Sequence, residues 1–189
     1  FDLSFSRILG FNAQNVFLTS IEAMVIKNFQ DFHHNELYAI FRHIYLTSSF
    51  MSDDFDLRFN NSVSFKNYYQ QILDRPGSFV LIALIDEKPA GYLLLEPNPA
   101  MHLKHTALLN MGIIDIFRRQ GIGVKLVEAA FERARAEKII EIIYLMVRSD
   151  NFAALQLYKK TGFETLTYLE NDTKVGNEYF DGVVMRKFL

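Results

Sequence analysis

The sequence predicts an α/β domain with a mixed, mostly antiparallel sheet and helices on both faces. Its 189 residues, half of them apolar, fit one ordinary domain that can bury a sizeable core. Two short apolar segments, 79–85 and 90–95, flank the polar residues 86–88, a pattern typical of a β-hairpin. The apolar run 106–114, a helix and a strand at 141–147 follow one another closely, which predicts a right-handed parallel crossover.

Residues 1–22 are apolar without a regular period, and we expect them to form an extension that packs on the domain. The domain itself is expected to occupy 23–189, because no repeat, low-complexity tract or linker divides that stretch. At its start, the apolar residues 23–27 predict a first strand.

Two helices are expected between this strand and the hairpin. The first should begin near Asp31, because apolar residues then recur at helical spacing. These residues are Leu37, Ile40, Phe41, Ile44 and Tyr45. The second helix should run over 64–73, with Ser64 as its N-cap, and the sequence 75–77 should stop it.

After the crossover unit, a helix is expected over 151–160, closed by Gly162. Two final strands are expected at 165–169 and 179–187. The polar segment 171–177 should separate them as a loop.

The composition narrows the function classes. A formal net charge of -2 gives no general attraction to nucleic acid or to anionic lipid. No apolar run approaches the roughly 20 residues that span a bilayer. The absence of cysteine excludes disulfides, a thiolate nucleophile and cysteine-ligated metal. We therefore expect a cytoplasmic protein without nucleic-acid, membrane or metal partners, in which any anion site is local.

The polar turn after the run 106–114 has the features of such an anion site. It contains Arg118, Arg119, Gly121 and Gly123, and it leads into a helix that should end near Glu137. The first backbone N–H groups of a helix have no intrahelical partners and carry the positive end of the dipole, which suits a phosphate. The arginines add local positive charge, and the glycines permit close approach to the backbone.

The same turn has simpler explanations when it is taken alone. Two glycines and two arginines also make a tight turn with a solvated basic rim. A dinucleotide fingerprint would need a glycine where Leu126 stands, and a Walker loop would need Gly-Lys-Ser/Thr, so neither of these nucleotide motifs fits.

A second motif follows the strand 141–147. Asn151 and Ala154 are followed by Leu157-Tyr158 and then by Gly162-Phe163. Together the two motifs resemble those of the GNAT superfamily of N-acetyltransferases, specifically over 106–163. Arg118, Gly121 and Gly123 match the loop with which that family binds the pyrophosphate of coenzyme A.

The resemblance implies an enzyme that moves an acetyl group from acetyl-CoA directly to a primary amine of a small molecule or peptide, with no metal. It implies that the two parallel strands splay apart and that the cosubstrate lies between them. Its contacts would come from backbone groups of the first strand, from the turn and helix start, and from the second motif. The residues so implied are Met111, Ile113, Arg118, Arg119, Gln120, Gly121, Ile122, Gly123, Asn151, Ala154 and Tyr158.

Tyr158 is the residue that the resemblance assigns to catalysis. The family's matching tyrosine lies near the thioester sulfur and protonates the departing thiolate. A phenol with a pKa of about 10 is protonated at neutral pH, so it suits a general acid better than a base. Asn151 should orient the cosubstrate amide. Without the flanking motif, Tyr158 would be read as a helix tyrosine that packs in the core.

The general base is not fixed by the motifs. The family often places a glutamate on the strand before the turn, but 106–114 contains no carboxylate. Glu96, His102 and His105 are candidates, beside a water relay and the binding of an already neutral amine.

The acceptor also stays open. The second motif is most similar to that of ribosomal-protein N-terminal acetyltransferases, which carry glutamate where Met146 stands, so peptides, polyamines, amino acids and aminoglycosides all remain candidates. The chain has 18 Phe and no Trp, and its aromatic residues concentrate before residue 65. Core packing, a homodimer surface or an apolar acceptor pocket would each explain that bias. Two other classes compete with the enzyme: a regulatory domain that binds acetyl-CoA without turnover, and an interaction domain that binds another nucleotide.

Overall fold

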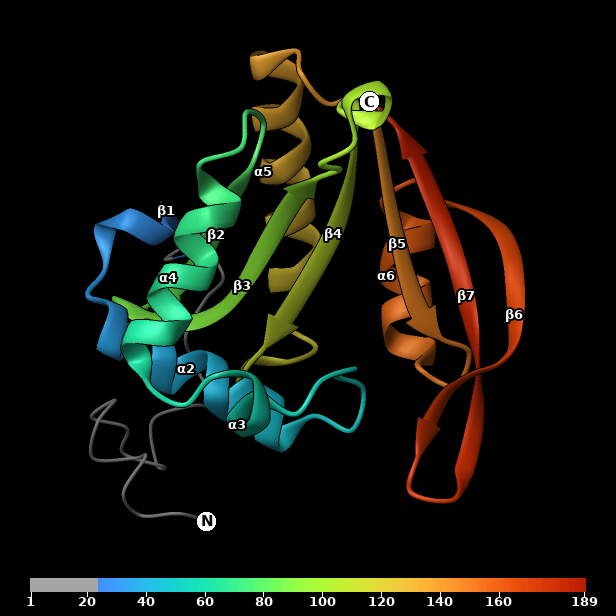
Figure 1. The fold of residues 1–189 in the computed structure, drawn as a ribbon, viewed down its shortest axis with the longest axis horizontal. Coiled ribbons are helices and arrows are strands. Elements are labelled where there is room, and N and C mark those ends of the chain that lie inside the picture. Colours follow the sequence, from blue (N-terminus) through green and yellow to red (C-terminus); the bar gives the residue numbers. More distant parts are fainter. Residues whose placement is uncertain (1–23) are drawn as a thin grey trace.

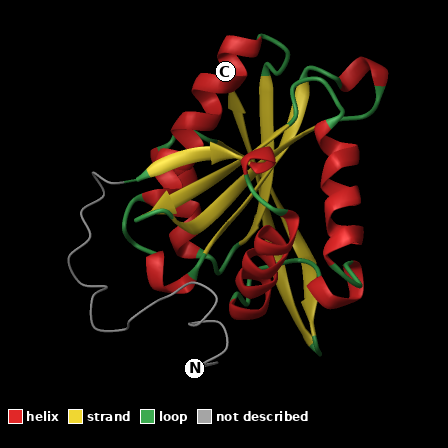
Figure 2. Cartoon of the chain, turned by 90° about the vertical axis from the view of Figure 1, so that its left-hand side faces the viewer, coloured by secondary structure: helices red, strands yellow, loops and turns green. Residues whose placement is uncertain are grey.

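The computed structural model describes residues 24–189, which form one sheet with helices on both faces (Figures 1 and 2). The strand order is β1-β2-β3-β4-β5-β7-β6, and every neighbouring pair is antiparallel except β4 and β5. The strands are β1 Val25–Asn28, β2 Phe79–Ile85, β3 Lys88–Pro97, β4 Thr106–Ile113, β5 Ile142–Arg148, β6 Glu164–Val175 and β7 Glu178–Phe188. The predicted α/β class and mixed sheet are confirmed.

The helices cover the sheet from two sides. Those of four or more residues are α2 His34–Thr47, α3 Phe55–Arg58, α4 Ser62–Leu73, α5 Ile122–Glu137 and α6 Phe152–Lys160. Short 3-10 turns stand at η3 Phe29–Asp31, η4 Met101–Leu103 and η5 Asp115–Phe117. In Figure 1, α2 and α4 lie in front of β2 and β3, whereas α5 and α6 lie behind the sheet. In the part of the chain that the structure describes, no helix has the length and apolarity that a membrane crossing requires.

The predicted extension over 1–22 lies outside the described residues. The predicted first strand is β1, which pairs antiparallel with β2. The hairpin β2–β3 is tighter than the sequence suggested, because Lys88 already pairs with Ile85. Asp86 and Glu87 alone form the turn, and both have a positive φ, as a two-residue primed hairpin turn requires.

Helix α4 corrects one sequence prediction. Its N-cap is Asn61, whose side-chain oxygen accepts hydrogen bonds from Val63 N at 3.0 Å and Ser64 N at 2.9 Å. Ser64, the predicted cap, is the third residue of the helix and completes a capping box. Asn and Ser both cap helices well, so the sequence alone did not decide between them.

The aromatic residues of the N-terminal half form the core. Phe41, Phe55, Phe65 and Tyr69 are almost fully buried, and their rings contact one another at centroid distances of 4.7 to 6.0 Å. Phe41 also stacks on Tyr92 of β3 at 3.9 Å. Core packing therefore accounts for most of the aromatic residues between 24 and 69.

The β4–α5–β5 unit contains the predicted parallel pair. Its register covers only Thr106–Leu108 of β4 and Ile142–Tyr144 of β5. Beyond these three residue pairs the strands separate, and Figure 1 shows β4 and β5 diverging toward the lower part of the molecule. The predicted splayed pair is thus present.

The C-terminal strands differ from the prediction. The polar segment 171–177, expected to be a loop, mostly continues the two strands, and the turn falls at Gly176 and Asn177. Because β6 lies at the sheet edge and both of its faces are largely exposed, it carries no apolar alternation that would reveal its length.

Candidate active site

Helix α5 begins with backbone amides that no side chain caps. Its N-cap is Gly121, with a φ of 80°, a left-handed conformation that glycine adopts without strain. Within residues 24–189, this helix start has no side-chain cap hydrogen bond. The free N–H groups and the dipole give this helix start a partial positive charge that suits an anion.

The residues before this helix have separate roles in the loop. Arg118 is exposed and donates from Nε to the carbonyl oxygen of Ile113, at 3.1 Å. Arg119 is exposed and adopts a positive φ of 62°. The side-chain amide of Gln120 donates to the carbonyl oxygen of Ile116 at 3.1 Å, so Gln120 fastens the turn.

Gly123 lets helix α5 approach the Leu157 side chain of α6 closely. A Cβ atom built on it would lie 2.4 Å from Leu157 Cδ1 of α6 and 3.2 Å from Ile113 Cδ1 of β4. The sequence alone suggested that this glycine permits the approach of an anion. The structure adds a second reason, since the backbone of α5 touches α6 here.

The splayed strands leave backbone groups of β4 without a strand partner. Asn98 N donates to Thr106 O, and Ile114 N donates to Ala90 O, both at 2.9 Å, so even-numbered residues of β4 direct their backbone groups toward β3. Odd-numbered residues therefore face β5. Met111 and Ile113, the two residues predicted to offer backbone contacts, face the opening where β5 has moved away.

Asn151 and Tyr158 lie on the other side of this opening. Asn151 is the N-cap of α6, and its side-chain oxygen accepts a hydrogen bond from Ala154 N at 3.2 Å. That bond occupies the oxygen and leaves the side-chain nitrogen to contact a ligand. Tyr158 is 7% exposed, and burial raises the pKa of its phenol far above the usual value. The phenol is therefore a proton donor over the whole physiological pH range.

One elongated cavity of about 1000 Å³ joins these features. It extends from the turn at Arg118 and the start of α5, along β4, to Tyr158 and the ends of β5 and α6. Every residue that the sequence analysis assigned to the site lines this cavity, except Gln120. The structure thus brings together residues from the two motifs.

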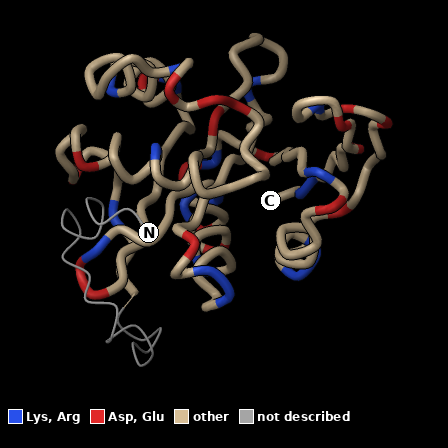
Figure 3. The backbone as a smooth tube through the Cα atoms, turned by 90° about the horizontal axis from the view of Figure 1, so that it is seen from below, with Lys and Arg blue, Asp and Glu red and all other residues tan. Residues whose placement is uncertain are grey.

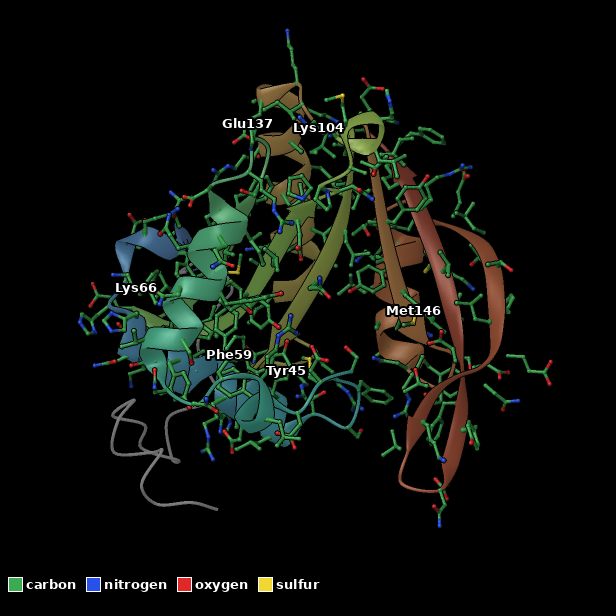
Figure 4. The ribbon with its side chains drawn as sticks, viewed as in Figure 1. Tyr45, Phe59, Lys66, Lys104, Glu137 and Met146 are labelled. Carbon is green, nitrogen blue, oxygen red and sulfur yellow. The ribbon has the colours of Figure 1, made fainter. Side chains whose placement is uncertain are left out.

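The far end of the cavity contains residues that the sequence analysis did not assign to the site. Tyr45 of α2, Phe50, Met51 and Tyr92 line it from the N-terminal half, and Met146 lines it from β5. Figure 4 shows Tyr45 near the lower end of β4 and Met146 across the opening on β5. Tyr45 belongs to the apolar helical pattern, and Tyr92 belongs to an apolar strand, so both had the signature of ordinary core residues.

The phenols of Tyr45 and Tyr92 influence each other's pKa. Burial raises the pKa of Tyr45, and the interaction with the Tyr92 phenol partly offsets this rise. Burial also raises the pKa of Tyr92. The far end of the cavity therefore combines protonated phenols with apolar side chains, and Ser48, Ser52 and Arg148 also line it.

None of the candidate bases lines the cavity. Glu96 forms an ion pair with Arg75, with an Oε1 to Nη1 distance of 2.9 Å. His102 and His105 lie before β4, at the end where β4 and β5 are still paired. Among the described residues, the cavity lining contains no aspartate, glutamate or histidine.

Comparisons with known proteins agree with this geometry. The model of the acetyltransferase (GNAT) family matches residues 35–163. An N-alpha-acetyltransferase of Saccharolobus solfataricus is 25% identical over 133 residues, 62% of this chain and 79% of that protein. An L-amino acid N-acetyltransferase of Escherichia coli is 26% identical over 120 residues, 64% of this chain and 74% of that protein. The crystal structure of a GNAT-family acetyltransferase from Streptococcus pneumoniae superposes with a TM-score of 0.79 at 25% identity, covering 88% and 99% of the two chains.

Proposed function

Because this chain belongs to the acetyltransferase (GNAT) family, we propose that it acetylates the primary amine of a small molecule or a peptide and that the cavity along β4 is its active site. Family membership makes the chain an acyl-CoA-dependent acetyltransferase with acetyl-CoA as cosubstrate. The acceptor and the roles of individual residues are the proposed part.

One observation carries the proposal. A single continuous cavity contains an uncapped helix start, an unpaired strand edge and a buried phenol. These three features suit the three parts of acetyl-CoA in order, namely its diphosphate, its amide-bearing arm and its thioester. A regulatory domain without turnover would need the first two features but would have no use for a buried proton donor at the third.

The donor would be held mainly by main-chain groups. The first amides of α5, helped by Arg118 and Arg119, would bind the diphosphate oxygens. The backbone groups of Met111 and Ile113 would pair with the amides of the pantetheine arm as an added strand does. This pairing explains how the open edge of β4 is satisfied when the donor is bound.

Transfer would be direct. The neutral amine nitrogen attacks the thioester carbonyl carbon, the carbon–sulfur bond breaks, and the Tyr158 phenol gives its proton to the departing sulfur. The amine gives up one proton, which water in the cavity carries away, and Tyr158 is reprotonated from water. Positioning of the two reactants and protonation of the thiolate would supply the acceleration.

The lining of the far end indicates the kind of acceptor. Tyr45, Phe50, Met51 and Met146 offer rings, thioethers and a phenol, and the charged side chains that line the cavity are all cationic. Figure 3 shows Lys and Arg interspersed with Asp and Glu along the described chain. We therefore propose an acceptor with one amino group on an apolar body, such as an amino-acid derivative or a peptide N-terminus, rather than a polyamine or an aminoglycoside.

Two measurements test the proposal. Isothermal calorimetry should show binding of acetyl-CoA and coenzyme A and no binding of ATP alone, and a preference for ATP would contradict the cosubstrate assignment. Thiol release should then be followed with L-phenylalanine amide, a tripeptide, spermidine and an aminoglycoside as acceptors. Turnover with the first two is expected. Binding of acetyl-CoA without thiol release from any amine would instead favour the regulatory domain.

A further inference from the structure

We propose that Arg148 is a positioning residue that fixes the segment 48–52 as one wall of the acceptor end of the cavity. Arg148 is the last residue of β5, and its side chain is 10% exposed. The inference rests on the proposed function, because it gives this wall a role in binding the amine.

The contacts of Arg148 reach three separate parts of the chain. Nε and Nη2 donate to the two carboxylate oxygens of Asp150 at 3.0 and 2.7 Å, and Nη1 donates to the carbonyl oxygen of Ser49 at 2.9 Å. The guanidinium carbon lies 3.6 Å from the ring centroid of Phe180 on β7 and 5.1 Å from that of Phe50. One side chain thus joins β5, β7 and the segment after α2.

These contacts cross the opening between the two halves of the sheet. At Arg148, β5 is four residues beyond Tyr144, its last residue in register with β4. Segment 48–52 belongs to the N-terminal half, and Ser48, Phe50, Met51 and Ser52 all line the cavity. Arg148 therefore holds together, from across the gap, two walls that the sheet does not join there.

The contacts that Arg148 makes require an arginine. The planar guanidinium can bind both carboxylate oxygens of Asp150, stack on an aromatic ring and still donate to a carbonyl, which the ammonium of lysine does not reproduce. The Arg148 hydrogen bond lowers the pKa of Asp150, so the pair stays ionised at neutral pH. Asp150 orients the guanidinium, and the remaining donor is available for Ser49.

Within segment 48–52, Met51 packs against the hydrophobic core, whereas Ser49, Phe50 and Ser52 are exposed. Phe50 is 40% exposed, and within the segment Phe50 N donates to Ser48 Oγ at 3.2 Å. The Ser49 carbonyl bond to Arg148 spans 99 positions of the sequence. Loss of the Arg148 contacts should make segment 48–52 more mobile. Misplacing a substrate by about 1 Å can cost up to about 10²-fold in rate.

The test compares Arg148→Met with Arg133→Met. Arg133 is a matched control, because it makes the same three kinds of contact and does not line the cavity. It forms an ion pair with Glu137 at 2.8 Å and a hydrogen bond to Asn28 at 2.6 Å. Its guanidinium carbon lies 4.4 Å from the ring centroid of Phe79. Hydrogen exchange by mass spectrometry reports on segment 48–52. Steady-state kinetics with L-phenylalanine amide and acetyl-CoA gives the two KM values.

Arg148→Met should speed exchange in 48–52 but not in α4, and it should raise the KM for L-phenylalanine amide about tenfold while leaving the acetyl-CoA dissociation constant unchanged. Arg133→Met should do neither. Arg148→Lys, which keeps the charge, should restore little of the loss and provides a second variant if the first does not fold.

Two results would overturn the inference: unchanged exchange in 48–52, or an equal rise of both KM values that Arg133→Met reproduces. If the wild-type protein releases no thiol with any amine, the proposed function fails, but the exchange experiment still decides whether Arg148 holds this segment.

Discussion

The two halves of the sheet are built in opposite ways. In the N-terminal half, all seven residues of β2 are buried, and aromatic rings from α2, α3 and α4 pack over β3. In the C-terminal half, eleven of the twelve residues of β6 are exposed, and Tyr158 is the buried residue of α6. Only three residue pairs between β4 and β5 join the halves within the sheet.

The residues that contribute most to stability and the residues proposed for catalysis therefore lie in different halves of the sheet. The N-terminal half holds most of the hydrophobic core, which Ile143, Leu145 and Met185 of the C-terminal strands also join, and burial of this core drives folding. The C-terminal half supplies Tyr158, Asn151 and Arg148, and the cavity lies at the boundary. A change in the first half should therefore act on unfolding, and a change at the boundary should act on binding or turnover.

The largest effect is expected from Phe65→Ala in the N-terminal core. Phe65 is fully buried among aromatic rings, so its loss leaves a cavity and should cost about 3–5 kcal/mol of unfolding free energy. Tyr168→Ala on β6, where the residue is 65% exposed, should change stability by less than about 0.5 kcal/mol. Urea titrations measure both values. Equal losses for the two variants would refute the contrast between the halves.

Tyr158→Phe should lower turnover about 10²-fold, because it removes the proton donor and keeps the ring. Binding of acetyl-CoA should be unchanged by calorimetry. Tyr69→Phe is the matched control, since Tyr69 is an equally buried phenol that lies in the aromatic core and does not line the cavity. Unaltered kcat in Tyr158→Phe would remove the acid role from this residue.

Gly121→Val should weaken acetyl-CoA binding about tenfold, because a β-branched residue at a φ of 80° costs about 1–2 kcal/mol and displaces the start of α5. Gly176→Val is the control. Gly176 also has a positive φ, of 61°, but it lies in the β6–β7 turn with nothing near its Cβ position. The same strain there should leave the dissociation constant as it was. A loss of affinity in both variants would mean that backbone strain acts on the whole fold.

The smallest effect is expected from Glu96→Gln, which should leave kcat/KM unchanged, since Glu96 pairs with Arg75 away from the cavity. In both proteins kcat/KM should rise with pH up to the pKa of the acceptor amine, because the described lining holds no carboxylate or imidazole. Burial raises the pKa of Tyr158, so its protonated, active form persists above pH 10. Profiles with two amines of different basicity check this. The rise of kcat/KM with pH could instead have the same midpoint for both amines. If Glu96→Gln removed such a rise, Glu96 would be identified as the base.

The sequence predicted the elements that carry regular signals. The hairpin and the β4–α5–β5 unit were found from apolar runs and short polar connections, and the matches to two motifs placed most of the proposed cosubstrate site. The extent of β6 and β7 was missed because a two-sided exposed strand has no apolar period. Helix α3, with four residues, is too short to show one.

The acceptor end could not be predicted for a different reason. Tyr45 and Tyr92 lie in apolar patterns that indicate core, and their partners are distant in the sequence. Arg148 had no predicted role, since its contacts to Ser49 and Phe180 depend on tertiary structure. Local patterns identify the donor loop because one short segment builds it, whereas the acceptor wall is assembled from residues 45–52, Tyr92 and Met146, which are distant in the sequence.

The contact between Gly123 of α5 and Leu157 of α6 has a consequence for how the donor is used. The backbone of the helix that faces the diphosphate packs against the Leu157 side chain, next to Tyr158, so we expect a shift at this helix start to move the phenol. Binding energy from the remote nucleotide portion can then set the geometry at the reacting sulfur. A shortened thioester such as S-acetylpantetheine, which lacks the diphosphate, should therefore react slowly even at saturating concentration.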